Sequence, residues 1–556
     1  MTDLEIARGA QILPIALIAE SLGLDQEQLE LYGHYKAKLP LSLIDEEKIA
    51  QNKLVLVSAI SPTPAGEGKT TVSIGLSDAL NQIGKRAVVV LREPSLGPVF
   101  GIKGGATGGG KSQLLPMEDI NLHFTGDFSA VEKAHNLLAA LIDNHLQRQH
   151  KENLQIDPRT IAWKRVMDMN DRSLRQVMVG LGGTNEGVPR QTGFDITAAS
   201  EIMAILCLAD SLTDLKRRMG SIFVGYTYDK QPVYARDLKA EGAMATLLKD
   251  AIKPNLVQTL EGNPAIIHGG PFANIAQGTN TVIATKTGMS LGDYTITEGG
   301  FGFDLGAEKF YDIKCQSAGL RPDALVMTVT IRALKYHGGV KLADLKKPDV
   351  TALIKGLPNL EKHLENARKF GVPPIIALNR FATDSEEEIA VIEELGERNG
   401  IPVAVADVWA KGGSGAIELA AKLVQLIEEG LADFRPLYKW EQDVRTKIET
   451  IAKEIYGADN VRYSDRALQD LRRIEHLGLQ GLPICIAKTQ KSLSDDPTLL
   501  GRPTGFDFKI REIEIAAGAG FIIPIAGDMM RMPGLPAKPA AHNIDIDDDG
   551  HVSGLF

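Results

Sequence analysis

The sequence of 556 residues contains few cysteines, few aromatic residues and no excess of positive charge. Its three cysteines, Cys207, Cys315 and Cys485, are far apart and form neither a zinc-binding spacing nor a disulfide framework, so a reducing compartment is expected. Lysine and arginine total 61 against 71 aspartate and glutamate residues, giving a net charge of −10. This balance argues against a protein with general affinity for nucleic acid.

Long apolar runs are also missing, since no run approaches the roughly 18 residues that a membrane-spanning helix needs. The N-terminal segment starts with acidic residues and lacks the basic start of a secretory signal. We therefore expect a cytoplasmic protein with no membrane partner. A hydrophobic content of 44% and a charged content of 24% are typical of a globular chain with a full core.

The strongest pattern lies in residues 53–93. An apolar run, 54–60, meets a turn-rich segment that ends in Gly66-Glu67-Gly68-Lys69-Thr70-Thr71. Apolar residues at helical spacing follow in 72–83, and a second apolar run, 87–91, completes a strand–loop–helix–strand unit. The glycines let backbone N–H groups turn onto a phosphate, while Lys69 can reach the outer phosphates and Thr70 can offer its hydroxyl to Mg²⁺. The pattern predicts a nucleotide-phosphate site, and the alternative is a glycine-rich turn without a ligand.

Three positions in this unit depart from common nucleotide-binding patterns. The pattern G-x-x-x-x-G-K-[ST] would place glycine at Thr63, and switch ATPases often carry a lysine where this chain has Pro64. The run 87–91 ends in Arg92, where such proteins usually have an acid that serves water and Mg²⁺. Because a guanidinium offers a planar fork to a carboxylate or phosphate, Arg92 favours carboxylate activation over a hydrolytic switch.

Two later segments are candidates for loops over a site. Residues 97–111 are too glycine-rich to hold a core, so they form either a linker or a structured loop, and we favour the loop. His268 follows the apolar run 265–267 and precedes Gly269 and Gly270. It is either a buried structural residue or part of a pocket wall.

The second half of the chain alternates between helix and strand patterns, with helices at 361–370, 385–399 and 415–429 and strands at 374–378 and 402–406. This alternation predicts an α/β fold: a mostly parallel sheet of P-loop NTPase type with additional α/β domains. Prolines in 346–360 suggest a boundary, so we expect domains at 1–345, 346–480 and 481–556. Further expectations are a helix at 25–31, a helix at 130–149, a strand at 481–487 and a hairpin turn, without a metal, in the acidic residues 545–550.

Phe381 and Trp409 each follow one of these predicted strands. Since parallel sheets bind ligands at the carboxyl ends of their strands, the two rings are candidates for a stacking pair. Burial in the core is the alternative.

The chain resembles formate–tetrahydrofolate ligase along essentially its whole length. The resemblance is carried by residues 63–71, 101–111, 116–127, 268–274, 329–339, 379–381 and 532–556. The chain departs from the family's usual residues at Thr107, at Lys111, where a tyrosine is common, and at Gln277, where histidine is frequent. No dehydrogenase or cyclohydrolase segment is attached, so it is similar to the monofunctional form.

This resemblance implies a two-step reaction in which ATP phosphorylates formate and N10 of tetrahydrofolate then attacks formyl phosphate, giving 10-formyltetrahydrofolate. It also implies that Arg92 clamps formate, that Phe381 and Trp409 enclose the pterin, that Asp127 and His268 lie near the site and that Glu93 supports the loop or subunit contacts. It implies an ATP site formed by Thr63, Pro64, Ala65, Gly66, Glu67, Gly68, Lys69 and Thr70, the last serving Mg²⁺. The family is typically a homotetramer stimulated by a monovalent cation such as K⁺ or NH₄⁺, and its folate substrate can be polyglutamylated.

Two other classes compete with this interpretation. One is a switch or partitioning ATPase whose output is a partner interaction. The other is a GTPase in which residues 379–384 are a degenerate guanine-reading motif, with Arg380 in place of lysine.

Overall fold

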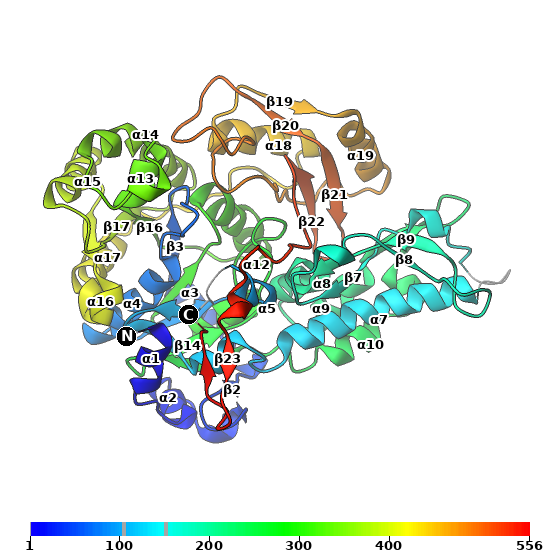
Figure 1. Ribbon diagram of the computed structural model, residues 1–556, viewed down its shortest axis with the longest axis horizontal. Helices are drawn as coiled ribbons and strands as arrows, with labels where there is room; N and C mark the ends of the chain where they lie inside the picture. Colours follow the sequence, from blue (N-terminus) through cyan, green and yellow to red (C-terminus); the bar gives the residue numbers. More distant parts are fainter. Residues whose placement is uncertain (1, 103–106, 149–153, 556) are drawn as a thin grey trace.

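The computed structural model describes residues 2–102, 107–148 and 154–555 (Figure 1). Its organising strand, β3 (Lys53–Ala59), alternates its side chains between two cores. Leu54 and Leu56 belong to one core, and Val55 and Val57 to the other. Because successive side chains of a strand point to opposite faces, this sheet must be covered on both sides.

Within the part of the chain that the structure describes, the sheet has 12 strands and is mostly parallel, as predicted. Its parallel part runs in the order β14-β4-β15-β3-β16-β17-β18. Besides β3, the strands of the parallel part are β14 (Pro264–Ile267), β4 (Ala87–Leu91), β15 (Tyr294–Glu298), β16 (Ala324–Val329), β17 (Pro374–Asn379) and β18 (Val403–Ala406). Beyond β14 the sheet continues antiparallel with β13 (Asn255–Thr259), β2 (Ala37–Lys38), β1 (Glu30–Leu31), β6 (Ser112–Leu115) and β5 (Gly108–Gly109).

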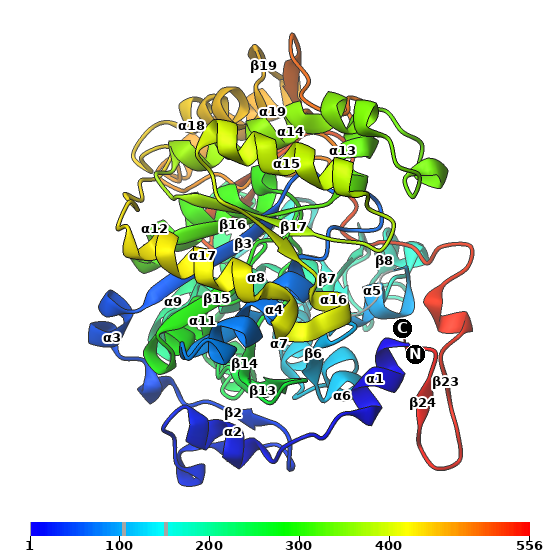
Figure 2. The ribbon, with the colours of Figure 1, turned by 90° about the vertical axis from the view of Figure 1, so that its left-hand side faces the viewer.

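Helices cover both faces of this sheet (Figure 2). One face packs against α4 (Lys69–Gln82) and α17 (Ile417–Glu428). The other packs against α13 (Ile331–His337), α14 (Val350–Lys369), α15 (Glu386–Asn399) and α18 (Val444–Ile451). Near β4 and β14 the cover is supplied by α2 (Ile15–Ser21) and α11 (Val282–Leu291), which lies next to α3 (Glu46–Gln51).

A second core lies beside the sheet, around the long helix α7 (Asp127–Gln147) (Figure 1). Three shorter helices pack with it: α8 (Glu201–Leu208), α9 (Leu212–Gly220) and α10 (Glu241–Leu247). Small strands border this region: β7 (Arg165–Met167), β8 (Val177–Val179), β9 (Arg190–Thr192), β10 (Phe194–Ile196), β11 (Phe223–Tyr226) and β12 (Pro232–Tyr234).

The C-terminal part adds two small sheets and a hairpin. Strands β19 (Asn460–Tyr463) and β20 (Asp507–Ile510) pair with each other, as do β21 (Glu512–Ala516) and β22 (Phe521–Ile525), with α19 (Asp465–His476) against β21. The predicted hairpin turn is confirmed as β23 (Asp545–Ile546) and β24 (Val552–Ser553). This hairpin lies beside α1 (Asp3–Gly9), where Arg8 donates to the carbonyl of Val552 at 2.5 Å.

Several local expectations are wrong. The predicted helix at 25–31 is a short 3₁₀ turn, Gln26–Gln28, followed by β1, because Glu30 and Leu31 pair with β2. Residues 481–487 form only isolated bridges to β22 instead of a strand. By contrast, the predicted helix at 130–149 is confirmed as α7, which ends at Gln147, while residue 149 lies outside the described residues.

Most of the segment 346–360, where we expected a domain boundary, is helical. Pro348 precedes helix α14, which begins at Val350 and contains Pro358, and β17 and β18 continue the same sheet as β3 and β16. The sheet therefore runs across residue 345, and the three-part division of the chain stays a prediction.

Candidate functional site

A cavity of about 450 Å³ opens at the carboxyl ends of the parallel strands. Lys69 and Thr70 line it from the start of α4, Arg92 and Glu93 from the end of β4, and Glu298 from the end of β15. These residues come from separate parts of the sequence. The sheet topology brings them together, as expected for a ligand site in an open α/β sheet.

The glycine loop, residues 60–68, joins β3 to α4 and forms one wall of the cavity. Gly66 and Gly68 have φ angles of 83° and 74°, in the left-handed region that glycine tolerates best. A Cβ on Gly68 would lie 2.4 Å from Asn379 Nδ2, which donates to the Glu67 carbonyl at 3.0 Å. The loop thus needs glycine at 68 and directs the N-terminus of the 14-residue helix α4 into the cavity.

Glu67 holds the glycine loop in shape. Its buried carboxyl accepts from the Thr63 backbone N–H at 2.6 Å and from the Thr63 hydroxyl at 2.9 Å. It also accepts from the hydroxyl of Thr330, the residue that caps α13. Burial raises the pKa of Glu67. This side chain ties the loop to α13, a connection that no local pattern in the sequence indicates.

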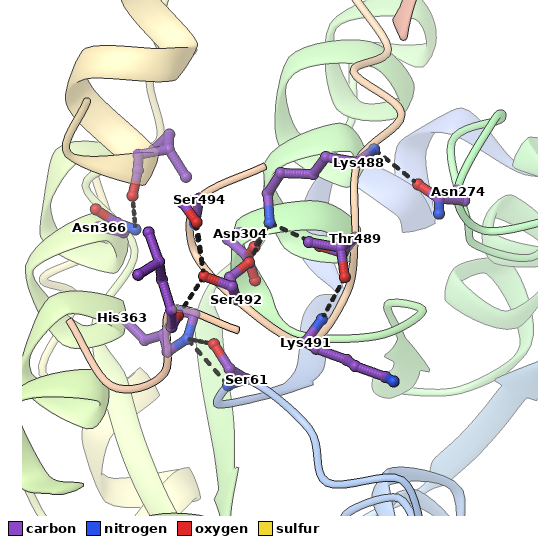
Figure 3. A network of polar contacts seen from close by, with 12 residues as sticks. Ser61, Asn274, Asp304, His363, Asn366, Lys488, Thr489, Lys491, Ser492 and Ser494 are labelled. Atoms are coloured by element: carbon purple, nitrogen blue, oxygen red, sulfur yellow. Dashed lines mark hydrogen bonds and ion pairs between the residues drawn. The ribbon is translucent and has the colours of Figure 1, made fainter. Parts of the chain in front are cut away.

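The entrance to the loop is fixed by a second set of buried contacts. The Ser61 backbone N–H donates to His363 Nε2 at 3.0 Å, and the Ser61 hydroxyl lies 3.1 Å from the same nitrogen (Figure 3). Burial lowers the pKa of His363 to about 4, so its ring is neutral and can accept the backbone hydrogen bond. On the other side, His337 Nε2 lies 2.8 Å from the Ser61 carbonyl.

Glu298 is the site residue that sequence reasoning missed. The interpretation of Arg92 assumed that β4 is the neighbour of β3, which is wrong, because β15 lies between them. Its last residue, Glu298, accepts from the Thr70 hydroxyl at 2.8 Å and has Oε1 3.9 Å from Arg92 Nη2. An acid therefore does stand beside the glycine loop, and the available signal was the strand-like run Tyr-Thr-Ile-Thr at 294–297, rich in β-branched residues and followed by Glu-Gly-Gly.

Arg92 and Glu93 follow each other at the end of β4 but differ in their surroundings. Arg92 is partly exposed, and its Nε has no hydrogen-bond partner among the described residues. Glu93 is buried, and within the described chain its Oε2 also lacks a partner. Burial, and then the nearby charge of Asp127, raise the pKa of Glu93 well above its usual value. Neither Arg92 Nε nor Glu93 Oε2 therefore gives a hydrogen bond within the described chain that a ligand would have to replace.

Asp127 and His268 lie in the interior and do not line this cavity. Asp127 forms a buried ion pair with Lys38 at 2.8 Å and accepts from Asn255 at 2.8 Å. His268 Nδ1 lies 2.7 Å from the Thr281 hydroxyl, and its Nε2 is 2.7 Å from the Ala251 carbonyl. Burial lowers the pKa of His268 to about 4, so the ring is neutral. Of the two alternatives for His268, the geometry matches the structural one.

The two candidate stacking rings have different surroundings. Phe381 follows β17 and is half-buried, with the Arg332 guanidinium 3.8 Å above its ring centroid. Trp409 lies in α16 (Val408–Lys411), and 55% of its surface is exposed, so it is not a core residue. The carbonyl of Trp409 accepts from the Lys111 backbone N–H at 2.8 Å. This contact joins α16 to the end of the glycine-rich stretch.

The glycine-rich stretch 97–111 is structured where it is described. It includes α5 (Leu96–Phe100) and β5, and Gly108 lines the cavity. The family-like segment 101–111 includes residues 103–106, which lie outside the described residues.

A family model of formate–tetrahydrofolate ligase matches residues 1–556, the entire chain. The chain belongs to the formate–tetrahydrofolate ligase family. Its members join formate to tetrahydrofolate at the expense of ATP and give 10-formyltetrahydrofolate. The family requires ATP and Mg²⁺ and takes formate and tetrahydrofolate as substrates, so the switch-ATPase and GTPase alternatives are set aside. Among the described residues, no helix has the length and apolar character to cross a membrane.

Proposed function

We propose that the cavity beside the glycine loop is where this ligase transfers phosphate from ATP to formate, on a core of P-loop NTPase type. The observation that carries the proposal is the meeting of Lys69, Arg92 and the α4 N-terminus in one cavity of about 450 Å³. A helix N-terminus and two cations suit a group with several negatively charged oxygens.

The glycine loop and the start of α4, residues 63–70, then bind the ATP phosphates through their backbone N–H groups, and Lys69 binds the phosphoryl group that is transferred. Thr70 and Glu298 fit the Mg²⁺ that accompanies ATP, since hydroxyl and carboxylate oxygens are hard ligands of the kind Mg²⁺ prefers. When bound, Mg²⁺ neutralises charge on the phosphate chain.

Arg92 orients formate so that a carboxylate oxygen attacks the terminal phosphorus of ATP. The new P–O bond gives formyl phosphate as ADP leaves. The exposed part of the Arg92 guanidinium can then hold the acyl phosphate. In the second step N10 of tetrahydrofolate attacks the formyl carbon, the C–O bond to phosphate breaks and the N10 proton is released.

Phe381 and Trp409 bind the pterin ring of the folate by stacking. Support comes from the 55% exposure of Trp409 and from the partial exposure of Phe381, whose ring lies under the Arg332 guanidinium. Asp127 and His268 act through other residues: the Asp127–Lys38 pair sets the charge around Glu93, and His268 anchors the strand end before Gly269.

Further traits rest on the family resemblance. We propose a homotetramer of the cytoplasm, stimulated by a monovalent cation such as K⁺ or NH₄⁺, that accepts polyglutamylated folates. Glu93 would contribute to the loop or to subunit contacts.

The decisive experiment is to measure ATP consumption with and without formate and tetrahydrofolate. We expect steady-state ADP release only when both substrates are present. ADP release that ignores both substrates would contradict carboxylate activation in this cavity, and a requirement for GTP would contradict the ATP assignment.

A further inference from the structure

Two residues of the cavity wall come from a part of the chain that the proposed function leaves unused. Gln490 and Lys491 line the cavity together with Lys69, Arg92 and Glu298. They belong to the anchored segment, residues 488–494, which follows the 481–487 run that bridges to β22. Their approach to the site depends entirely on how this segment is held.

The anchored segment is fixed by a buried charge pair (Figure 3). Lys488 is fully buried, with its Nζ 2.7 Å from Asp304 Oδ2. The same ammonium donates to the carbonyls of Thr489 at 3.0 Å and of Ser492 at 2.5 Å. Asp304 lies in the π-helical turn Phe303–Ala307, shortly after Glu298. The pair therefore fastens the segment to the part of the fold that also supplies Glu298.

Further buried contacts hold both ends of the anchored segment. The Lys488 backbone N–H donates to Asn274 Oδ1 at 3.2 Å, and Asn274 belongs to the loop that brings Phe272 to the cavity. At the other end, the Ser492 hydroxyl donates to the Leu499 carbonyl at 2.5 Å and lies 3.0 Å from the Ser494 hydroxyl. A buried ion pair requires such additional hydrogen bonds to offset its loss of hydration. The network thus gives the backbone around Lys491 one conformation.

Lys491 itself is the exception in this segment, because its side chain is exposed and extends away from the network (Figure 3). Within the described chain, no carboxylate lies at ion-pair distance from its ammonium. The cavity already contains Lys69, Arg92 and the α4 N-terminus. A third cation placed there by a rigid segment raises the local positive charge, which suits an anionic ligand with more than one charged oxygen.

We propose that Lys491 binds a phosphate oxygen of the reacting phosphoryl group, on ATP or on formyl phosphate, and that the Lys488–Asp304 pair positions it. This inference rests on the proposed function of the same cavity. A lysine ammonium is a compact point charge on a long flexible stem. It can follow a phosphoryl oxygen while the phosphorus moves from ADP to formate, whereas the backbone N–H groups of the glycine loop stay in place.

The test compares Lys491→Ala, Lys491→Arg and a control, Lys355→Ala, which removes an exposed lysine from α14. Steady-state kinetics would give kcat and KM for ATP, formate and tetrahydrofolate, and calorimetry would give the affinities for ADP and for a non-hydrolysable ATP analogue, each with Mg²⁺. We expect Lys491→Ala to lower kcat/KM for ATP by about 10- to 100-fold, the usual effect of losing one charge-assisted hydrogen bond. Lys491→Arg should recover activity to within about fivefold, and Lys355→Ala should stay within about twofold of the parent.

The affinity for a non-hydrolysable ATP analogue, compared with that for ADP, distinguishes the two sources of the phosphate oxygen. Weaker binding of the analogue to Lys491→Ala, with unchanged ADP binding, places the contact on the terminal phosphate of ATP. Unchanged binding of both, with a lower kcat, places it on formyl phosphate. Equally weaker binding of both would overturn the inference, because ADP lacks the reacting phosphoryl group. The inference is overturned if only KM for tetrahydrofolate rises, which would assign Lys491 to a folate carboxylate. It is also overturned if Lys491→Arg is as poor as Lys491→Ala and both melt at lower temperature.

Lys69→Ala in the same assays separates this inference from the proposed function. Normal turnover of Lys69→Ala would remove the proposed phosphate site altogether. Normal turnover of Lys491→Ala alone, with Lys69→Ala inactive, would remove only the role assigned to Lys491.

Discussion

The glycine loop and the two candidate stacking rings differ in how firmly their residues are held. At the glycine loop, Thr63 and Glu67 are only 8% and 2% exposed, and buried hydrogen bonds tie the loop to α13. Of the two rings, Trp409 is 55% exposed, and Phe381 is half-buried with the Arg332 guanidinium above it. The roles proposed above match this difference, because rigid dipoles and charges lower a barrier, while stacking needs only an accessible surface.

The largest effect is expected from Arg92→Ala. Product formation should fall by about 10³-fold or more, because the variant loses the charged donor that orients formate and its phosphate. Binding of ATP should persist, since the glycine loop is unchanged. Parallel measurement of turnover and ATP affinity checks both statements, and near-normal turnover would refute the role of Arg92.

The next largest effect is expected from Glu298→Gln. The amide can still accept from Thr70, so the fold should remain intact, but the loss of charge weakens any Mg²⁺ held there. We predict a fall of about 10²-fold in kcat and a higher Mg²⁺ concentration for half-maximal activity. A Mg²⁺ titration at saturating ATP is the measurement. An unchanged titration curve would mean that Glu298 does not serve the metal.

Trp409→Ala should act on folate alone. Stacking of a flat ring on an aromatic side chain contributes about 1–3 kcal/mol, so KM for tetrahydrofolate should rise by about tenfold or more. The KM values for ATP and formate should stay within about twofold. Because the side chain is exposed, the melting temperature should hardly change. If the KM values for ATP, formate and tetrahydrofolate rose together, the specific role of Trp409 in folate binding would be contradicted.

The smallest effect on activity is expected from His268→Gln, whose consequence should instead appear in stability. The pKa of His268 is lowered from 6.5 to about 4 in the folded protein, so the unfolded chain takes up a proton more readily. The contribution of this histidine to stability is therefore complete above pH 6.5 and is lost as the pH falls toward 4. The variant should lose this pH dependence.

Melting curves of the parent and His268→Gln between pH 4 and 8 check this, alongside turnover at neutral pH. A loss of turnover as large as that of Arg92→Ala, with an unchanged melting temperature, would restore a catalytic role for His268. Thermal unfolding of the Lys355→Ala variant provides a baseline for a surface substitution.

Prediction from sequence succeeded where the signal is local. The unit 53–93 gave β3, the glycine loop, α4 and β4 nearly to the residue, because each element has its own periodicity and the glycines mark the turn. The alternation after residue 360 likewise predicted a parallel sheet, since neighbouring parallel strands need a crossover connection and a helix usually supplies it. It failed at 25–31, where pairing with β2 outweighs a weak helical pattern.

By itself the sequence determined the family, the phosphate loop pattern and the class of sheet, since all three are encoded in short contiguous stretches. Only the tertiary structure decided which residues meet. It inserted β15 between β3 and β4, which placed Glu298 beside Thr70 and Arg92, and it withdrew His268 and Asp127 into buried hydrogen bonds. It also brought Lys491 to a loop more than 400 positions away in the chain. Strand order and long-range contacts depend on packing between whole layers, and no local pattern of residue types records that packing.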